Sequence, residues 1–82
     1  MMDTMRIGDT TDRTLISFGR NVARIRNERG FSQDALAEKA DLDRTYVSGI
    51  ERGVRNPGIK IVLRIARALN VAVGDLCKGV DA

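Results

Sequence analysis

The 82-residue chain has 14 basic and 11 acidic side chains, for a net charge of +3, with one cysteine and no histidine. An internal disulfide and the Ser–His–Asp and Cys–His catalytic arrangements are therefore excluded, and a zinc site would lack its usual ligands. No apolar run approaches the ~20 residues that cross a bilayer and no secretory signal is evident, so we expect a small cytoplasmic domain that is not an enzyme and holds no cofactor or metal.

The first segment with a helical hydrophobic period begins at residue 14. We expect residues 1–13 to be a flexible N-terminal tail and residues 14–78 to be the folded domain. Residues 14–29 should form a helix that ends at Gly30, because apolar side chains recur there at spacings of three and four. These side chains are Leu15, Phe18, Val22 and Ile25.

Two short helices are expected on either side of a tight turn at residues 41–42. Ser32 and Asp43 are residue types that cap helix N-termini, so each should open one of them. On the second of these helices, Arg44 and its neighbours form an outward-facing polar surface, the arrangement with which proteins read the DNA major groove. Gly49 within this helix indicates either tolerance at an exposed site or close approach to a partner's backbone.

Two more helices are expected, over residues 59–69 and 73–77, which makes the chain all-α with five helices. The residue 59–69 pattern is apolar on more than one side, which indicates a helix that is either deep in a core or shared with a second subunit, and the small size of the domain favours the second. The candidate dimer-interface residues on these two helices and the loop between them are Ile61, Ile65, Val71, Leu76 and Cys77.

The chain resembles the helix-turn-helix pattern of the lambda and 434 repressor-like regulators, the XRE family, over residues 22–76. The matching residues are Gln33, Leu36, Ala37, Ala40, Leu42, Val47, Ser48, Ile50, Glu51 and Gly53. Residues 42–52, followed by residues 55–57, are also similar to the controller proteins of restriction–modification systems. The resemblance implies a five-helix lambda repressor-like DNA-binding domain. The chain departs from the family at Asp41, where glycine is usual, and at Gly58, where a serine cap is common.

Eight residues are expected to contact DNA: Gln33, Arg44, Thr45, Tyr46, Ser48, Arg52, Arg55 and Asn56. Arg44 should read guanine, because its forked guanidinium matches two acceptors on that base. The resemblance implies that Thr45 and Tyr46 act near the operator centre and that Gln33 binds a phosphate. The alternatives are a solvated Arg44, a half-buried Tyr46 and a Gln33 that is a polar cap residue. Arg52, Arg55 and Asn56 should bind phosphates or the groove edge.

Two further pairs of residues acquire roles from the resemblance. Arg26 and Glu51 should form a partly buried structural ion pair. Asp34 and Glu38 should lie on the outer face of their helix, either as a solvated acidic surface or as a contact to the sigma subunit of RNA polymerase.

The sequence therefore favours a homodimeric transcriptional regulator that binds a palindromic operator in double-stranded DNA. The specific hypothesis is a restriction–modification controller that autoregulates its own promoter. A phage-type repressor or an antitoxin with the same module is the first alternative, and a helical protein-interaction module that binds no DNA is the second.

Overall fold

Side-chain caps determine where the first three helices begin. In the computed structural model, which describes residues 12–80, the side chains of Asp12, Ser32 and Asp43 each accept a backbone N–H from the first turn of a helix. Such a contact satisfies a donor that has no partner within the helix. The helices that follow are α1 (Arg13–Glu28), α2 (Gln33–Ala40) and α3 (Arg44–Arg52). The caps expected at Ser32 and Asp43 are thus confirmed, and α1 begins one residue earlier than expected because Asp12 caps it.

Residues in the left-handed conformation end α2, α3 and α4 (Ile59–Leu69). Asp41 has a φ of 57°, Gly53 of 78° and Asn70 of 59°. Asp and Asn enter this region more readily than other side chains, so the turn between α2 and α3 forms without the family's glycine. Gly58 precedes α4 in an extended conformation and provides no side-chain cap. The short α5 (Val73–Leu76) completes the fold.

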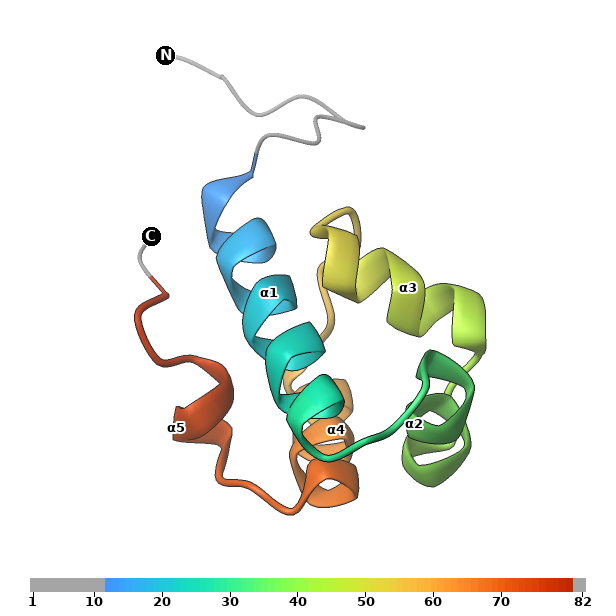
Figure 1. Ribbon diagram of the computed structural model, residues 1–82. Helices are drawn as coiled ribbons and strands as arrows, with labels where there is room; N and C mark the ends of the chain where they lie inside the picture. The colour runs from blue at the N-terminus through green and yellow to red at the C-terminus, as the bar shows by residue number, and fades with distance from the viewer. Residues whose placement is uncertain (1–11, 81–82) are drawn as a thin grey trace, which may run out of the picture.

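The helices pack around one core to which all of them contribute (Figure 1). Helix α1 contacts α3 and α5, while α2 contacts α3 and α4. The core consists of Phe18, Val22, Ile25, Leu36, Ala37, Val47, Ile50, Val62, Ile65, Ala66, Leu69 and Leu76. All regular secondary structure in residues 12–80 is helical, which confirms the five-helix, all-α prediction.

None of these helices is both long and apolar enough to span a bilayer. Residues 1–11 of the expected N-terminal tail lie outside the described residues.

Two of the expected dimer-interface residues belong to the subunit's own core. Ile65 and Leu76 are fully buried within the chain, so a partner subunit has no access to them. Helix α4 is apolar on several sides because it packs against α2 on one side and α5 on another. The chain itself therefore covers part of the apolar surface that the sequence pattern assigned to a partner, whereas Ile61 and Val71 are half-buried and Cys77 is exposed.

Gly19 allows α1 to approach the end of α3 closely, and its replacement gives a test of this packing. A Cβ atom at Gly19 would lie 2.6 Å from the carbonyl oxygen of Glu51 and closer still to that of Ile50. Backbone carbonyls at a helix end cannot move aside without repacking, so we expect Gly19→Ala to lower the free energy of unfolding by roughly 1–3 kcal/mol. Urea denaturation measures this loss.

Gly74→Ala is the matched control, because a Cβ atom at that position would have no neighbour within 4 Å. Equal denaturation midpoints for the Gly19→Ala and Gly74→Ala variants would show that α1 and α3 are not in close contact at Gly19.

Candidate nucleic-acid interface

Helix α3 has one side in the core and one side in solvent. Val47 and Ile50 are buried, and they fix the helix against α1 and α2. The opposite side, which we call the polar face of α3, consists of Arg44, Thr45, Ser48 and Arg52. Arg44, Thr45 and Arg52 are exposed and Ser48 is half-buried. The helix thus presents polar side chains outward from a fixed support, as reading of the major groove requires.

Arg44 and Asp34 form an ion pair between α3 and α2. Nε of Arg44 lies 3.2 Å from Oδ1 of Asp34, and the side chains are 55% and 78% exposed. An ion pair this exposed contributes only about 0–1 kcal/mol, so Arg44 can exchange Asp34 for another acceptor at little cost. The base-reading candidate and one of the two candidates for polymerase contact therefore interact directly, which the sequence did not indicate.

Thr45 is held at the start of α3 by Asp43. The Thr45 hydroxyl donates to Oδ1 of Asp43 at 2.8 Å, and the Thr45 backbone N–H donates to the same oxygen at 3.0 Å. The backbone N–H and then the hydroxyl lower the pKa of the Asp43 carboxyl below its ordinary value of 3.8. Next along the helix, Tyr46 is half-buried and packs against the core. This matches the alternative to DNA contact that was given for Tyr46, namely a half-buried packing residue.

The cap at Asp43 predicts a pH dependence of stability. A carboxyl with a lowered pKa in the folded state stabilises the fold above the unfolded pKa, and the stabilisation is lost as the pH falls through the folded value. In Asp43→Asn the cap does not titrate. We therefore expect the wild type to lose melting temperature relative to this variant as the pH falls through and below the ordinary carboxyl pKa of 3.8. Melts followed by circular dichroism at several pH values measure it, and a constant difference would show that Asp43 does not act as a charged cap.

Arg26 and Glu51 form an ion pair beneath the candidate interface. Nε of Arg26 lies 2.6 Å from Oε2 of Glu51, Nη2 donates to Oε1 at 3.1 Å, and the side chains are only 13% and 6% exposed. Nη1 of Arg26 also donates to the carbonyl oxygen of Phe31 at 2.8 Å. Nε2 of Gln33 donates to Oε1 of Glu51 at 2.9 Å. Helices α1, α2 and α3 are thus connected by one polar network, and the side-chain amide of Gln33 belongs to it.

The residues at the end of α3 lie at the surface. Nε of Arg52 donates weakly to Oγ of Ser48 at 3.4 Å, and Arg55 and Asn56 are exposed in the loop that follows. Gly49 is buried, so the interpretation of this glycine as tolerance at an exposed site is wrong. The side chain of Arg55 covers it instead. The eight candidate DNA contacts therefore divide into a polar face, a loop beside it, and two residues tied to the interior, Gln33 and Tyr46.

Arg64 of α4 stabilises the turn between α2 and α3, a role that the sequence alone did not indicate. Its Nε donates to the carbonyl oxygen of Ala40 at 2.9 Å, and its Nη2 donates to the carbonyl oxygen of Asp41. These carbonyls end α2 and have no partner within it. An arginine in an apolar helix carries no local signal of such a contact, because the contact depends on how α4 packs against α2.

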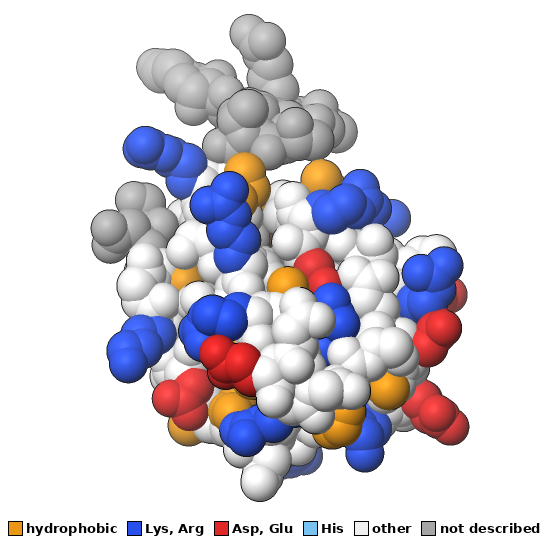
Figure 2. Space-filling view, in the orientation of Figure 1, with side chains coloured by type: hydrophobic (Ala, Val, Ile, Leu, Met, Phe, Trp, Pro, Cys, Tyr) orange, Lys and Arg blue, Asp and Glu red, His pale blue; other side chains and the backbone are white. Residues whose placement is uncertain are grey.

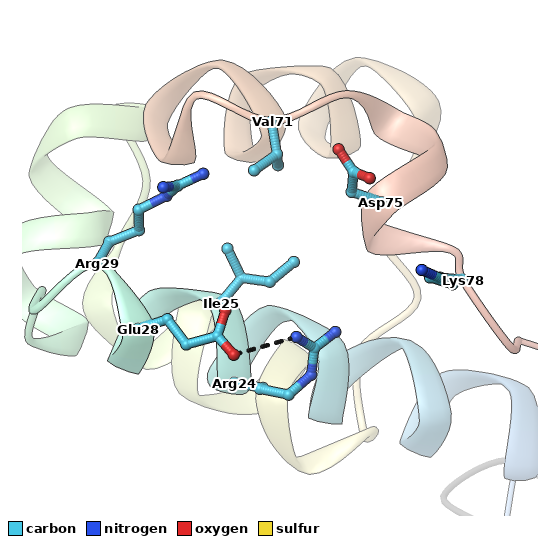
Figure 3. Close-up of a pocket in the computed structure, with 7 residues that line it drawn as sticks. All are labelled: Arg24, Ile25, Glu28, Arg29, Val71, Asp75 and Lys78. Atoms are coloured by element: carbon cyan, nitrogen blue, oxygen red, sulfur yellow. Dashed lines mark hydrogen bonds and ion pairs between the residues drawn. The ribbon is translucent and has the colours of Figure 1, made fainter.

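A groove of about 320 Å³ lies between α1 and α5, away from the polar face of α3 (Figure 3). Arg24 pairs with Glu28 at 3.3 Å, and Nε of Arg29 donates to a backbone carbonyl at the end of α4 at 3.0 Å. Asp75 accepts a backbone N–H before α5 at 3.0 Å. These contacts engage four of the five charged side chains that line the groove, so most of its charge is already paired within the chain. It is lined by Arg24, Ile25, Glu28, Arg29, Val71, Asp75 and Lys78.

Charge on the surface is mixed in sign. Figure 2 shows basic and acidic side chains interspersed over the face seen in Figure 1. The net charge of +3 is therefore a poor guide to where an anion binds. The cations at the two ends of α3, Arg44 at one end and Arg52 and Arg55 at the other, are a better guide, because they lie on or beside the same outward-facing helix.

Comparison with known proteins gives matches along most of the chain. The model of the helix-turn-helix family matches residues 22–76. The control protein C.BamHI of Bacillus amyloliquefaciens is 42% identical over 67 residues, which are 80% of this chain and 83% of that protein. The crystal structure of the restriction-modification controller protein C.AhdI from Aeromonas hydrophila has a TM-score of 0.75 at 40% identity, covering 76% of this chain and 94% of that one.

A third similar protein, the controller C.Esp1396I, is known as a tetramer in complex with its natural 35-base-pair operator. That structure has a TM-score of 0.69 at 37% identity and covers 79% of this chain and 96% of that one. Other structures of C.Esp1396I carry single substitutions of an arginine, a threonine and a tyrosine at three consecutive positions.

Proposed function

Because this chain belongs to the helix-turn-helix family, we propose that it is a sequence-specific DNA-binding transcriptional regulator and, more narrowly, a restriction–modification controller protein. The polar face of α3 is the observation that carries the proposal. Its side chains project from a helix that is anchored on its other side by the core, and an α-helix fits the width of the major groove. The operator complex of C.Esp1396I supports the same assignment.

In the proposed complex α3 lies in the major groove, and Arg44 leaves Asp34 to bind O6 and N7 of a guanine. Arg44, Thr45 and Tyr46 are the one place in the sequence where these three residue types follow each other. The controller C.Esp1396I has the same three residue types in the same order at consecutive positions. Arg52 and Asn56 bind phosphates at the end of the helix, which sets its register.

We place the homodimer contact on the exposed apolar side of α4. Ile59 and Leu63 lie one turn apart on α4 and are 66% and 39% exposed, so they present two adjacent apolar side chains to a partner. An apolar groove of about 210 Å³ lies beside Ile59 and also contains Cys77, one of the expected interface residues. A palindromic operator would require the dimer to hold its two α3 helices about 34 Å apart, one DNA turn.

Footprinting on DNA upstream of the gene, combined with sedimentation of the complex, tests this proposal. We expect two protected half-sites about one DNA turn apart, one dimer for each pair, and affinity that falls steeply with salt as counterions are released. Leu63→Glu should weaken dimerisation and operator binding together, whereas Val54→Ser, which changes another exposed apolar residue, should not. Absence of a footprint on that DNA, or a footprint made by a monomer, would contradict the proposal.

Activation of the promoter is a second part of the proposal. Asp34 and Glu38 are exposed four residues apart on α2, and the Asp34 carboxylate becomes free when Arg44 turns to a base. We propose that the two acids then contact the sigma subunit of RNA polymerase, and that higher occupancy represses the same promoter. Replacing both acids with alanine should abolish activation in a transcription assay and leave operator binding intact, whereas Glu28→Ala on α1 should change neither. Full activation by the double variant would exclude this contact.

A further inference from the structure

The side chain of Arg55 lies lengthwise over Gly49 of α3. A Cβ atom placed at Gly49 would be 2.6 Å from Cγ of Arg55, 3.6 Å from Cδ and 3.4 Å from Nε. Three successive atoms of one side chain thus lie close to the position where any other residue would have its own side chain. Gly49 is buried for this reason, although it is on the solvent side of the helix.

A backbone contact holds the loop in this position. The N–H of Val54 donates to the carbonyl oxygen of Gly49 at 2.9 Å, directly after the left-handed Gly53 that ends α3. This pairing reverses the chain so that the next residue, Arg55, returns over the last turns of the helix. The placement of Arg55 is therefore a product of the helix end as well as of its own side chain.

Arg55 thereby lies beside the polar face of α3. Gly49 follows Thr45 by one turn and precedes Arg52 by three residues, spacings that put side chains on the same side of a helix. Within residues 12–80 the Arg55 guanidinium makes no hydrogen bond or ion pair, whereas Arg44 pairs with Asp34 and Arg52 contacts Ser48. Its donors are free for a ligand.

We infer that Gly49 is a specificity-determining positioning residue. Its missing side chain lets the Arg55 stem lie across α3, so that the guanidinium reaches a base edge in the major groove rather than a phosphate beside the loop. The inference rests on the proposed function, since it requires α3 to enter that groove. A forked guanidinium in the groove recognises guanine through two acceptors, whereas a phosphate contact would bind every sequence equally.

Alanine at this position separates the role of Arg55 from that of the fold. Ala favours a helix more than Gly does, so the melting temperature of Gly49→Ala should equal or exceed that of the wild type. The added methyl group must displace the Arg55 stem, because an atom 2.6 Å from Cγ leaves no room for both. In the free wild-type protein, a nuclear Overhauser effect between Gly49 Hα and the Arg55 methylene protons should report the contact, and its absence would overturn the inference.

The test is a double-mutant cycle on operator affinity and on affinity for a scrambled duplex of equal length. Gly49→Ala and Arg55→Ala should each weaken operator binding roughly tenfold and change scrambled-duplex binding much less. The double variant should bind no more weakly than either single variant. This outcome would establish that Gly49 acts through Arg55.

Three results of the affinity measurements would also overturn the inference. The first is an operator affinity of Gly49→Ala equal to that of the wild type. The second is that Gly49→Ala reduces operator affinity just as much when residue 55 is already alanine. The third is that Gly49→Ala reduces affinity for the operator and for the scrambled duplex by the same factor. If the wild-type protein binds the operator and the scrambled duplex equally well, the proposed function is contradicted, and the inference that rests on it is contradicted too. Wild-type discrimination combined with any of the three results leaves the function standing and rejects the role of Gly49.

Discussion

Replacing Glu51 with alanine is expected to lower the free energy of unfolding by about 3–5 kcal/mol. Glu51 is the acceptor at the centre of the network that connects α1, α2 and α3, and its side chain is 6% exposed. Its removal leaves the guanidinium of Arg26, a side chain that is 13% exposed, without a counter-charge. A buried charge that has lost its partner retains its desolvation cost, which is why one replacement is so damaging. Denaturation in urea measures the loss.

The exposed ion pair between Arg24 and Glu28 supplies the control. These side chains are 52% and 60% exposed, so Glu28→Ala should cost no more than about 1 kcal/mol. Replacing Arg26 and Glu51 together with apolar residues of similar size should recover much of the stability, because neither charge is then left unpaired. A Glu51→Ala variant as stable as Glu28→Ala would show that the network does not hold the helices together.

Replacing Arg44 with alanine is expected to weaken operator binding by roughly tenfold to a hundredfold, since one bidentate contact to guanine is worth about 1–3 kcal/mol of discrimination. The fold should be unaffected, because Arg44 is 55% exposed and its pairing with Asp34 is weak. Binding to unrelated DNA should fall much less, as it depends mainly on phosphate contacts. Titration of labelled duplexes at constant salt measures both affinities.

Arg24→Ala is the matched control for Arg44→Ala. It removes the same charge and an ion pair of similar exposure, but from α1 rather than from the polar face of α3. Its effect on operator affinity should be small and independent of DNA sequence. Equal losses for the two variants would mean that Arg44 contributes charge alone and reads no base.

Local signals in the sequence predicted the helix ends and the family. Ser32 and Asp43 were expected as caps and Asp41 as the turn residue, and each depends on interactions with immediate chain neighbours. The similarity of residues 22–76 to helix-turn-helix regulators, and to restriction–modification controllers in particular, is confirmed by the family and relatives that match.

Contacts between helices were harder to predict than the helices themselves. Ile65 and Leu76 were expected at a contact with a partner subunit but are buried within the chain. The sequence pattern of an apolar residue is the same whether its own chain or another chain covers it. The positions of Arg64, over the end of α2, and of Arg55, over Gly49, depend on how the chain returns in three dimensions. Periodicity indicates which face of a helix is apolar but not what packs against it.

In the candidate site, too, features within one helix were predictable from the residue pattern and contacts between helices were not. The polar face of α3 was predictable from helical spacing, since its residues share one side of one helix. The pairing of Arg44 with Asp34 was not, because it joins two helices whose crossing is set by the core. The Arg26–Glu51 pair also joins two helices, and it was expected through the family resemblance alone.

The central claim is that Arg44 reads a guanine from within the major groove, and scanning the operator with 7-deazaguanine tests it most directly. This base pairs normally but lacks the N7 acceptor that a bidentate arginine requires. We predict a guanine in each half-site where the substitution weakens binding of the wild type and leaves binding of Arg44→Ala unchanged. If every substituted guanine affects the two proteins equally, Arg44 does not contact N7 and does not read a guanine.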